Sequence, residues 1–265
     1  DKQIIPLTAP AGFGAVTFAQ GAITEYLQTG ELPPLDCVDD AFGYASGALR
    51  FDLELAALGA QDIYLAIPFG RVDRRAGREP SASGEEQFSR AVRQWQDTLG
   101  LFDICLPPAA AGAIATMKTA AAHILIQREG PALHPGPRRY ARAWIRDGVL
   151  MGAALARVGL PAAGRDFIRW YARFQAEDGN LPDCADSAGC EWLPEYDSWG
   201  QLIFAVMDYY RFSGDTGFLA EMWPAVLKSV NYLEALRQRR MTPEYQAQDK
   251  LACYGLLPES MSHEG

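Results

Sequence analysis

The sequence predicts a mainly α-helical chain preceded by a smaller antiparallel β portion. Three observations support this prediction. Residues 1–80 contain short segments with the two-residue alternation of half-buried strands. A polar stretch then changes the composition of the chain. From residue 109 onwards, apolar residues recur at the three-and-four spacing of helices, and the helices are joined by connections that alternate between long and short.

The first 80 residues are expected to form part of an antiparallel sheet or sandwich. The segment ALRFDLEL, residues 48–55, places apolar side chains on one face and charged side chains on the other. The segment DIYLAIPF, residues 62–69, predicts a second strand bounded by Pro68 and Gly70. The earlier segments GAVTFA and AITEYLQT are also strand-like.

The polar stretch GRVDRRAGREPSASG indicates a boundary between domains. Ser83 and Glu86 at its end have the spacing of a capping box, in which each side chain bonds to the backbone N–H of the other residue. A helix should therefore begin here and run to about Leu99. The expected parts are a β-sandwich portion at 1–80, a linker with a helix at 81–108, and a helical domain at 109–265.

Five further helices are predicted after the linker. Their expected ranges are 109–127, 147–158, 162–177, 198–213 and 216–238. Pro161 suits the first position of the third helix, and Gly179 follows its end. We interpret the aromatic stripes along these helices as core packing, since they follow the spacing of one buried face.

The connections between these helices indicate where function should lie. The long ones are 128–146, 178–197 and 239–265, and the short ones contain only GLP or GD. Short connections make antiparallel helical hairpins. If the helices alternate up and down, all the long connections emerge at one end. We expect them to form one face, because loops on a rigid scaffold commonly hold functional residues.

Composition excludes some partners and leaves others open. The formal net charge of -9 disfavours nucleic acid and anionic membranes as partners, because both are themselves negative. The apolar run PPAAAGAIATMKTAAAHILIQ is interrupted by Lys118 and His123, which favours a buried helix over a membrane span. No signal peptide is visible, and both ends of the sequence suggest a piece of a longer protein, so cytoplasmic and secreted bacterial locations both stay open.

The cysteines and the absence of familiar motifs narrow the chemistry. Five cysteines, an odd number, argue against a full disulfide framework. Cys184 and Cys190 lie close in the sequence and form either a local disulfide or two free thiols, of which we favour the thiols. The sequence has no metal-binding, dinucleotide-binding or nucleophile-elbow spacing, so no metal and no cofactor is predicted. Carboxylate chemistry remains.

The first two long connections end in segments rich in aromatic and charged side chains. Arginine and aspartate make strong directional bonds to sugar hydroxyls, while aromatic rings cover the apolar face of a sugar. An alternative is that Asp147 and Asp197 only cap the helices that follow them. The candidate sugar-binding residues are Trp144, Arg146, Asp147, Tyr196, Asp197, Trp199 and Gln201.

The segment WIRDG before one helix, and the hairpin EYDSWGQLIFAVMDYYRFSGDTGFLAEMWPAVLKSVNYLEAL after it, resemble the six-hairpin glycosidases of the glucoamylase type and related bacterial families. The likeness extends from about residue 109 to the end. It implies an incomplete (α/α)6 toroid of helical hairpins preceded by an antiparallel β-sandwich portion. A closed barrel needs more helices than the five predicted, so the remainder of its own chain would complete it.

The resemblance also implies an activity and roles for particular residues. The expected activity is that of a glycoside hydrolase, with acid and base carboxyl groups acting on an α-glucan or a related oligosaccharide. Arg146 and Asp147 would hold hydroxyls of the non-reducing sugar. The aromatic candidates Trp144, Tyr196 and Trp199 would shape the subsite.

The general acid of such an enzyme is expected in the last long connection. Glu264 and Glu259 are the candidates there, and Glu264, beside His263, is preferred. The Trp-Glu pair typical of glucoamylases is absent, and the catalytic base is expected outside the sequence. Two alternatives therefore stay open, a non-catalytic glycan-binding module and a glycoside phosphorylase of the same architecture.

Overall fold

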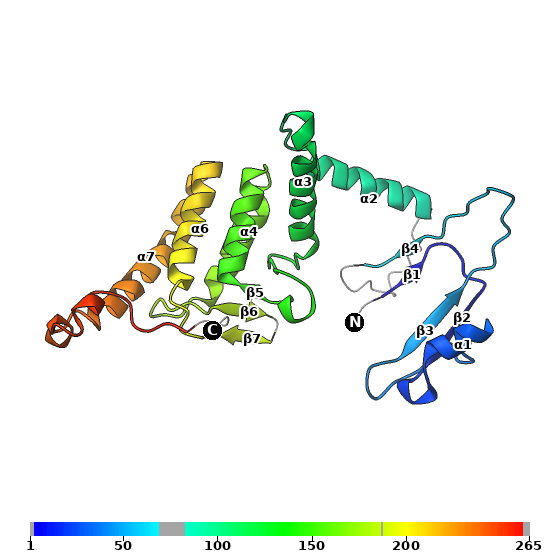
Figure 1. Ribbon diagram of the computed structural model, residues 1–265, viewed down its shortest axis with the longest axis horizontal. Helices are drawn as coiled ribbons and strands as arrows, with labels where there is room; N and C mark the ends of the chain where they lie inside the picture. Colours follow the sequence, from blue (N-terminus) through cyan, green and yellow to red (C-terminus); the bar gives the residue numbers. More distant parts are fainter. Residues whose placement is uncertain (1–2, 69–82, 187, 262–265) are drawn as a thin grey trace. The chain divides into compact units, whose positions relative to one another are not determined.

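The computed structural model describes residues 3–68, 83–186 and 188–261. Contacts divide the chain into two compact units, Asp1–Gln96 and Asp97–Gly265. Figure 1 shows the ribbon with most of its helices and strands labelled.

The first unit contains two small antiparallel sheets. Strand β1 (Ile5–Pro6) pairs with β4 (Leu65–Ala66), and β2 (Gly12–Val16) pairs with β3 (Ser46–Arg50). The structure therefore bears out antiparallel pairing in this part of the chain.

A packed β-sandwich, predicted for residues 1–80, is not shown. Among the described residues of this unit, Ala15 and Val16 are the buried hydrophobic side chains, whereas Phe13, Leu53 and Ile67 are exposed. Strands of two to five residues cover too little apolar surface to enclose a core between two sheets.

The strand predictions in this unit were right in part. Only the first residues of ALRFDLEL belong to β3, and residues 51–55 have no regular structure. Of DIYLAIPF, only Leu65–Ala66 forms a strand, and Phe69 lies outside the described residues. GAVTFA supplies the end of β2 and then enters a 3-10 turn, η1 (Phe18–Gln20).

The strand prediction for AITEYLQT was wrong, because this segment forms helix α1 (Ile23–Thr29). Glu25 lies in the first turn, where a negative charge favours a helix. Gly30 ends the helix in the left-handed conformation, with φ of 76°, and its N–H donates to backbone oxygens of the last turn. Gly30 was the sequence signal for the end of a helix, which the alternation of apolar and polar residues does not reveal.

Helix α2 (Gly84–Leu99) confirms the capping-box prediction. The backbone N–H of Ser83 donates to Oε2 of Glu86 at 2.8 Å, and the N–H of Glu86 donates to Oγ of Ser83 at 3.2 Å. Both bonds satisfy N–H groups that the first turn of a helix leaves without a partner.

All five further helices are present in the second unit. Turn η3 (Pro108–Ala110) leads into the first of them, and turn η5 (Ala172–Phe174) extends the third. The helices are α3 (Ala111–Ile126), α4 (Ile145–Arg157), α5 (Pro161–Tyr171), α6 (Ser198–Ser213) and α7 (Thr216–Gln238).

Short connections make hairpins of α4 with α5 and of α6 with α7, as expected. Pro161 occupies the start of α5. Gly214 ends α6 with φ of 67°, and Asp215 caps α7 by accepting a bond from the N–H of Phe218 at 2.9 Å. Helix α4 also packs against α6, so the two hairpins lie together (Figure 1). A closed toroid is not shown.

The core of the second unit lies among these four helices and the long connections. Helices α4 and α5 approach closely through glycine, since a Cβ built on Gly152 would lie 3.0 Å from Cα of Gly164. The largest fully buried side chains of this core include Leu133, Ile145, Phe167, Tyr171, Leu202, Val206, Phe218 and Leu236.

The prediction that α3 is a buried helix was wrong. Ala121 is its only buried residue, and His123 is exposed. Apolar residues lie all around this alanine-rich helix, so its pattern does not indicate which face packs against the protein. The segment Pro108–Ile126, with a mean hydropathy of 1.4, is long and apolar enough to cross a membrane by length and composition.

Replacing Gly148 by alanine should lower the free energy of unfolding by about 2 to 3 kcal/mol, because overpacking strains a filled core. A Cβ there would lie 2.0 Å from Cζ of Phe167. Gly200→Ala is the matched control, since a Cβ on this helical glycine meets nothing within 4 Å. It should raise stability by about 0.5 to 1 kcal/mol. Urea denaturation measures both, and equal effects would contradict the close packing of α4 on α5.

Candidate functional site

The long connections meet in a small sheet at one end of the helices. Strand β5 (Ala143–Trp144) pairs with β6 (Cys184–Asp186), which pairs with β7 (Gly189–Glu191), so the first two connections share one sheet. The N–H of Met261 donates to the backbone oxygen of Pro194 at 3.1 Å, which brings the third connection to the second. Figure 1 shows the sheet beneath α4 and α6. The expected gathering of long connections is therefore present.

The connections also contain short 3-10 turns. They are η4 (Arg138–Tyr140) in the first connection, and η6 (Pro243–Gln246) and η7 (Leu251–Cys253) in the third.

Strand register divides the residues of this sheet between two faces. Opposed residues share a face, and neighbours along a strand alternate. Ala143, Ala185 and Cys190 share the face that packs on the core. The other face, called here the outer face, holds Trp144, Cys184 and Glu191 in one row, with Asp186 two residues along β6.

This register explains why Cys184 and Cys190 are free thiols. The two side chains project from opposite faces of the hairpin, so they cannot bond without a shift of register. Burial raises the pKa of Cys184 to about 12 and also raises the pKa of Cys190. Of the two states considered from the sequence, the structure shows the thiols.

Arg146 is the centre of the polar network where these connections meet. It lies in the first turn of α4 and donates from Nε to Oδ2 of Asp197 at 2.8 Å. Its Nη2 donates to Oε2 of Glu195 at 2.5 Å. Nε2 of Gln201 donates to the same Oδ2 of Asp197 at 3.4 Å. The bond to Asp197 and the nearby carboxylate charges outweigh burial and raise the pKa of Arg146.

The two aspartates do not serve as side-chain caps. Trp144, not Asp147, occupies the N-cap position of α4, and Asp147 lies inside the first turn. Asp197 occupies the N-cap position of α6, but its carboxylate makes no capping bond and binds Arg146 instead. Helix α4 begins two residues earlier than the sequence predicted, which moves Asp147 from the cap into the helix.

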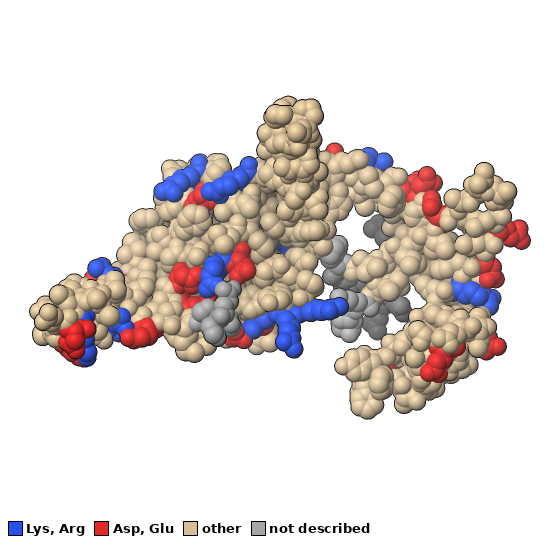
Figure 2. Space-filling model, in the orientation of Figure 1, with Lys and Arg blue, Asp and Glu red and all other residues tan. Residues whose placement is uncertain are grey.

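The cluster around Arg146 contains more acid than base. Asp147 adds its charge to those of Glu195 and Asp197, so three carboxylates face one guanidinium. Glu195 is 5% exposed, whereas Arg146 and Asp197 are each more than a third exposed and reach solvent. Figure 2 shows basic and acidic side chains interleaved near this end of α4 and α6. We call Arg146, Asp147, Glu195 and Asp197 the Arg146 cluster.

The aromatic candidates fall into two environments. Trp199 is 2% exposed and packs between Tyr196 and Tyr232, with ring centroids 5.5 Å and 4.8 Å away. Its Nε1 has no hydrogen-bond partner among the described residues. Because its ring is covered, Trp199 supports the partly exposed Tyr196 from beneath. It does not offer its own face to a ligand.

Trp144 lies on the outer face with two neighbours from the same connection. The ring of Tyr140 lies 6.2 Å away, and the guanidinium of Arg142 lies 5.7 Å from the ring centre. Arg142 donates to Asp186 at 2.6 Å and to Glu191 at 2.5 Å. These bonds, the one to Glu191 foremost, raise the pKa of Arg142 and tie the first connection to the β6–β7 hairpin.

Sequence reasoning missed two residues of this site. Glu195 stands two positions before Asp197 in LPEYD, and its carboxylate was the available signal. Tyr232 lies on α7, where its ring belongs to an apolar pattern typical of a core helix. Only the folded chain shows that α7 brings this ring beside Trp199.

Of the two candidate acids, only Glu259 lies among the described residues. Glu259 is largely exposed and pairs with Arg240. A backbone hydrogen bond and the Arg240 guanidinium lower the pKa of Glu259, whereas a general acid needs a raised one. This environment therefore favours a structural ion pair for Glu259. Glu264 and His263 lie outside the described residues, so Glu264 stays a prediction.

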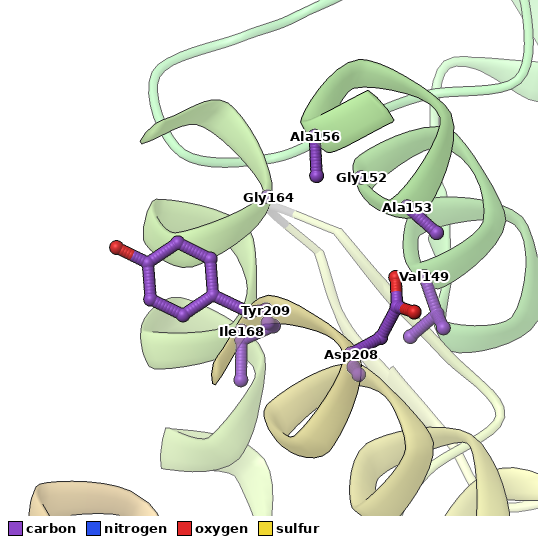
Figure 3. A pocket seen from close by; sticks show the side chains of 10 residues that line it. Val149, Gly152, Ala153, Ala156, Gly164, Ile168, Asp208 and Tyr209 are labelled. Atoms are coloured by element: carbon purple, nitrogen blue, oxygen red, sulfur yellow. The ribbon is translucent and has the colours of Figure 1, made fainter. Parts of the chain in front are cut away.

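A small pocket lies along α4, α5 and α6. Figure 3 shows the carboxylate of Asp208 turned toward it. Arg157 binds that carboxylate with two hydrogen bonds, of 2.8 Å and 3.1 Å. The pocket exists because residues without large side chains face it, among them Gly148, Gly152 and Gly164. Asp208 is fully engaged, so we assign the pocket to packing.

Comparison with known proteins gives one distant relative to report. A protein described as an uncharacterized glycosyl hydrolase of Methanocaldococcus jannaschii is 27% identical over 128 residues. The match covers 42% of this chain and 18% of that protein, so the chain spans less than a fifth of the relative's length. No family model matches the chain. The likeness supports a relationship to glycosyl hydrolases and nothing finer.

Alkylation tests the two faces of the hairpin. Without denaturant, iodoacetamide should modify the exposed Cys37 and Cys105 first and leave Cys184 unmodified, because Cys184 is buried and its pKa is raised. Mass spectrometry of the unreduced protein should show no Cys184–Cys190 disulfide. Finding that disulfide in the folded protein would contradict the register of β6 and β7.

Burial should determine the cost of breaking an ion pair. Glu195→Gln should lower the free energy of unfolding by about 1 to 3 kcal/mol, since it removes the charge-assisted bond of a buried carboxylate to Arg146. Glu221→Gln is the control, because Glu221 bonds to Arg169 at 2.6 to 3.0 Å but is exposed. It should cost less than about 1 kcal/mol. Equal costs in urea denaturation would contradict the buried setting of Glu195.

Proposed function

We propose that this chain carries the sugar-binding part of a glycoside hydrolase. The observation that supports this most strongly is the Arg146 cluster, with Tyr196 and Trp144 close to it in the sequence and the fold. The relationship to a protein described as a glycosyl hydrolase supports the same class of substrate.

The cluster offers the groups that a sugar needs. A sugar hydroxyl both donates and accepts hydrogen bonds, and neighbouring hydroxyls require paired partners. Asp197 and Arg146 are partly exposed, so a ligand reaches an acceptor and a donor side by side. Gln201 adds an amide beside them. The partly buried ring of Tyr196 adds apolar surface for the face of the sugar.

Preorganisation distinguishes this cluster from a surface ion pair. Glu195, itself buried, fixes one end of the Arg146 guanidinium, and Asp197 fixes the other. The guanidinium then keeps its orientation before a ligand arrives, so binding loses less side-chain entropy. Arg142 plays the same part for the sheet by holding Asp186 and Glu191.

The excess of acid also suits glycoside hydrolysis. Cleavage of a glycosidic bond passes through an oxocarbenium-like state that carries positive charge on the sugar. Asp147, Glu195 and Asp197 together outweigh Arg146, so the cluster favours that charge. In this proposal the substrate is an α-glucan or a related oligosaccharide, and the cluster holds its non-reducing sugar.

The proton-transfer groups complete the proposal. Glu264 is the proposed general acid, because Glu259 is bound to Arg240 and has a lowered pKa. The base would come from the part of the protein outside this sequence. An inverting enzyme would hold the two carboxyl groups roughly 6.5 to 9.5 Å apart, with the water between them.

The architecture proposed with this function is a six-hairpin toroid with a preceding β-sandwich. Two adjacent hairpins, α4–α5 and α6–α7, with their long connections at one end, are what such a repeat requires. Further hairpins in the rest of the protein would continue it.

One observation favours a second candidate, a glycan-binding module without turnover. The sequence lacks the Trp-Glu pair that would identify the acid in the last connection. A phosphorylase would differ in using phosphate where the hydrolase uses water, and turnover with and without inorganic phosphate separates these two.

Calorimetric titration with maltotriose tests the sugar site. Arg146→Ala should weaken binding at least about tenfold, which corresponds to about 1.4 kcal/mol, because the aligned donor is lost. Arg157→Ala is the control, since Arg157 pairs with the buried Asp208 away from the connections. It should lower stability and leave the dissociation constant within about twofold.

Two results would overturn the proposal. One is the absence of binding by the wild-type protein to maltotriose and to a panel of other oligosaccharides. The other is equal weakening by Arg146→Ala and Arg157→Ala, which would reduce the Arg146 cluster to a structural ion pair. Release of sugar from oligosaccharides by the wild-type protein would separate the hydrolase from the binding module.

A further inference from the structure

The turn η4, Arg138–Tyr140, has a charge opposite to that of the protein as a whole. Arg138 and Arg139 are both exposed, and neither forms an ion pair with another described residue. The chain contains 33 acidic and only 24 basic residues, so basic side chains without an acidic partner stand out.

The backbone of this turn is strained at Arg138. Its φ of 61° lies in the left-handed region, which residues with a Cβ rarely adopt. The turn is held by the N–H of Ala141, which donates to the backbone oxygen of Arg138 at 3.1 Å, and by the N–H of Tyr140, which donates to Pro137 at 3.2 Å. Strain of this kind persists where the surroundings enforce it, and it gathers at ligand-binding sites.

Arg142, the next arginine along the chain, differs from these two because its charge is already paired. Arg142 follows four residues after Arg138, but its guanidinium is committed to Asp186 and Glu191. Arg142 therefore positions the sheet, whereas the N–H donors of Arg138 and Arg139 are available to a ligand. The rings of Tyr140 and Trp144 lie 6.2 Å apart between the turn and the start of α4, and they offer apolar surface beside these charges.

The turn thus differs in charge from the end of this connection at Arg146. The Arg146 cluster places three carboxylates beside one guanidinium, whereas the turn holds two arginines and no acid, so the turn is the better place for an anionic group. We propose that the turn Arg138–Tyr140 binds the anionic group of an acidic sugar, a uronic acid carboxylate or an ester sulfate, in the same glycan whose neutral sugar lies at Arg146. This inference rests on the proposed function and specifies its substrate class.

The arginine fork suits both anionic groups. A guanidinium donates two parallel N–H bonds to two oxygens of a carboxylate or sulfate, which a neutral hydroxymethyl group cannot match. The ring of the acidic sugar would lie against Tyr140 and Trp144. No covalent step is involved, and the turn acts in recognition alone.

Matched sugars test the proposal. The wild-type protein is titrated with maltotriose, with maltotriose oxidised to a uronic acid at one sugar, and with maltotriose sulfated at one sugar. Either acidic form should bind about tenfold more tightly than maltotriose at low salt, and added salt should reduce the preference. Which acidic form binds more tightly identifies the anionic group.

The double variant Arg138→Ala/Arg139→Ala should lose this preference and keep the affinity for neutral maltotriose within about twofold. The control is Arg211→Ala/Lys228→Ala, which removes two exposed positive charges from α6 and α7 of the same unit. The control should keep the preference, because the effect depends on location and not on net charge.

The inference is overturned if wild-type protein binds acidic and neutral sugars equally, if the double variant keeps the preference, or if the control loses it equally. In those cases, maltotriose binding that still depends on Arg146 leaves the proposed function standing. Conversely, acidic sugar binding that requires Arg138 and Arg139 but is unaffected by Arg146→Ala supports the turn and overturns the proposed function.

Discussion

The bond pair from Arg146 to Glu195 and Asp197 joins the start of α4 to the connection that leads into α6. Its constraint is electrostatic, because a carboxylate as buried as Glu195 is stable in its charged form only with a partner of opposite charge and hydrogen bonds. Once this pair of bonds forms, the first two long connections are held in fixed positions relative to each other. The pairing of β5 with β6 then extends that relation to the outer face of the sheet.

The packing of the helices serves the same arrangement. Gly152 and Gly164 let α4 and α5 approach closely, and Gly148 leaves room for Phe167. Phe167 and Tyr171 fill the core beside the sheet. The hydroxyl of Tyr171 donates to the backbone oxygen of Pro182 at 3.2 Å. A connection supported in this way from the core keeps its polar residues in place, although it has little regular structure of its own.

The sequence predicted the helical part well, because caps, glycines and apolar spacing agree there. The capping box of Ser83 and the proline that opens α5 are examples. It predicted less of the first unit, where short strands depend on partners distant in the sequence, and it assigned α1 wrongly. Within the site it found Arg146 and Asp197 but missed Glu195, since burial of a loop carboxylate is a tertiary property.

The distribution of charge gives the site a direction. Acid predominates around Arg146, and uncompensated base predominates at the turn that precedes Trp144. Between them, Arg142 pairs with both Asp186 and Glu191, a group with one more negative than positive charge, so it adds no attraction for an anion. A glycan lying across Trp144 would therefore meet opposite fields at its two ends, which selects its orientation as well as its composition. Because fields of opposite sign discriminate more sharply than aromatic surface alone, the proposed recognition depends on where charge lies along the chain of sugars.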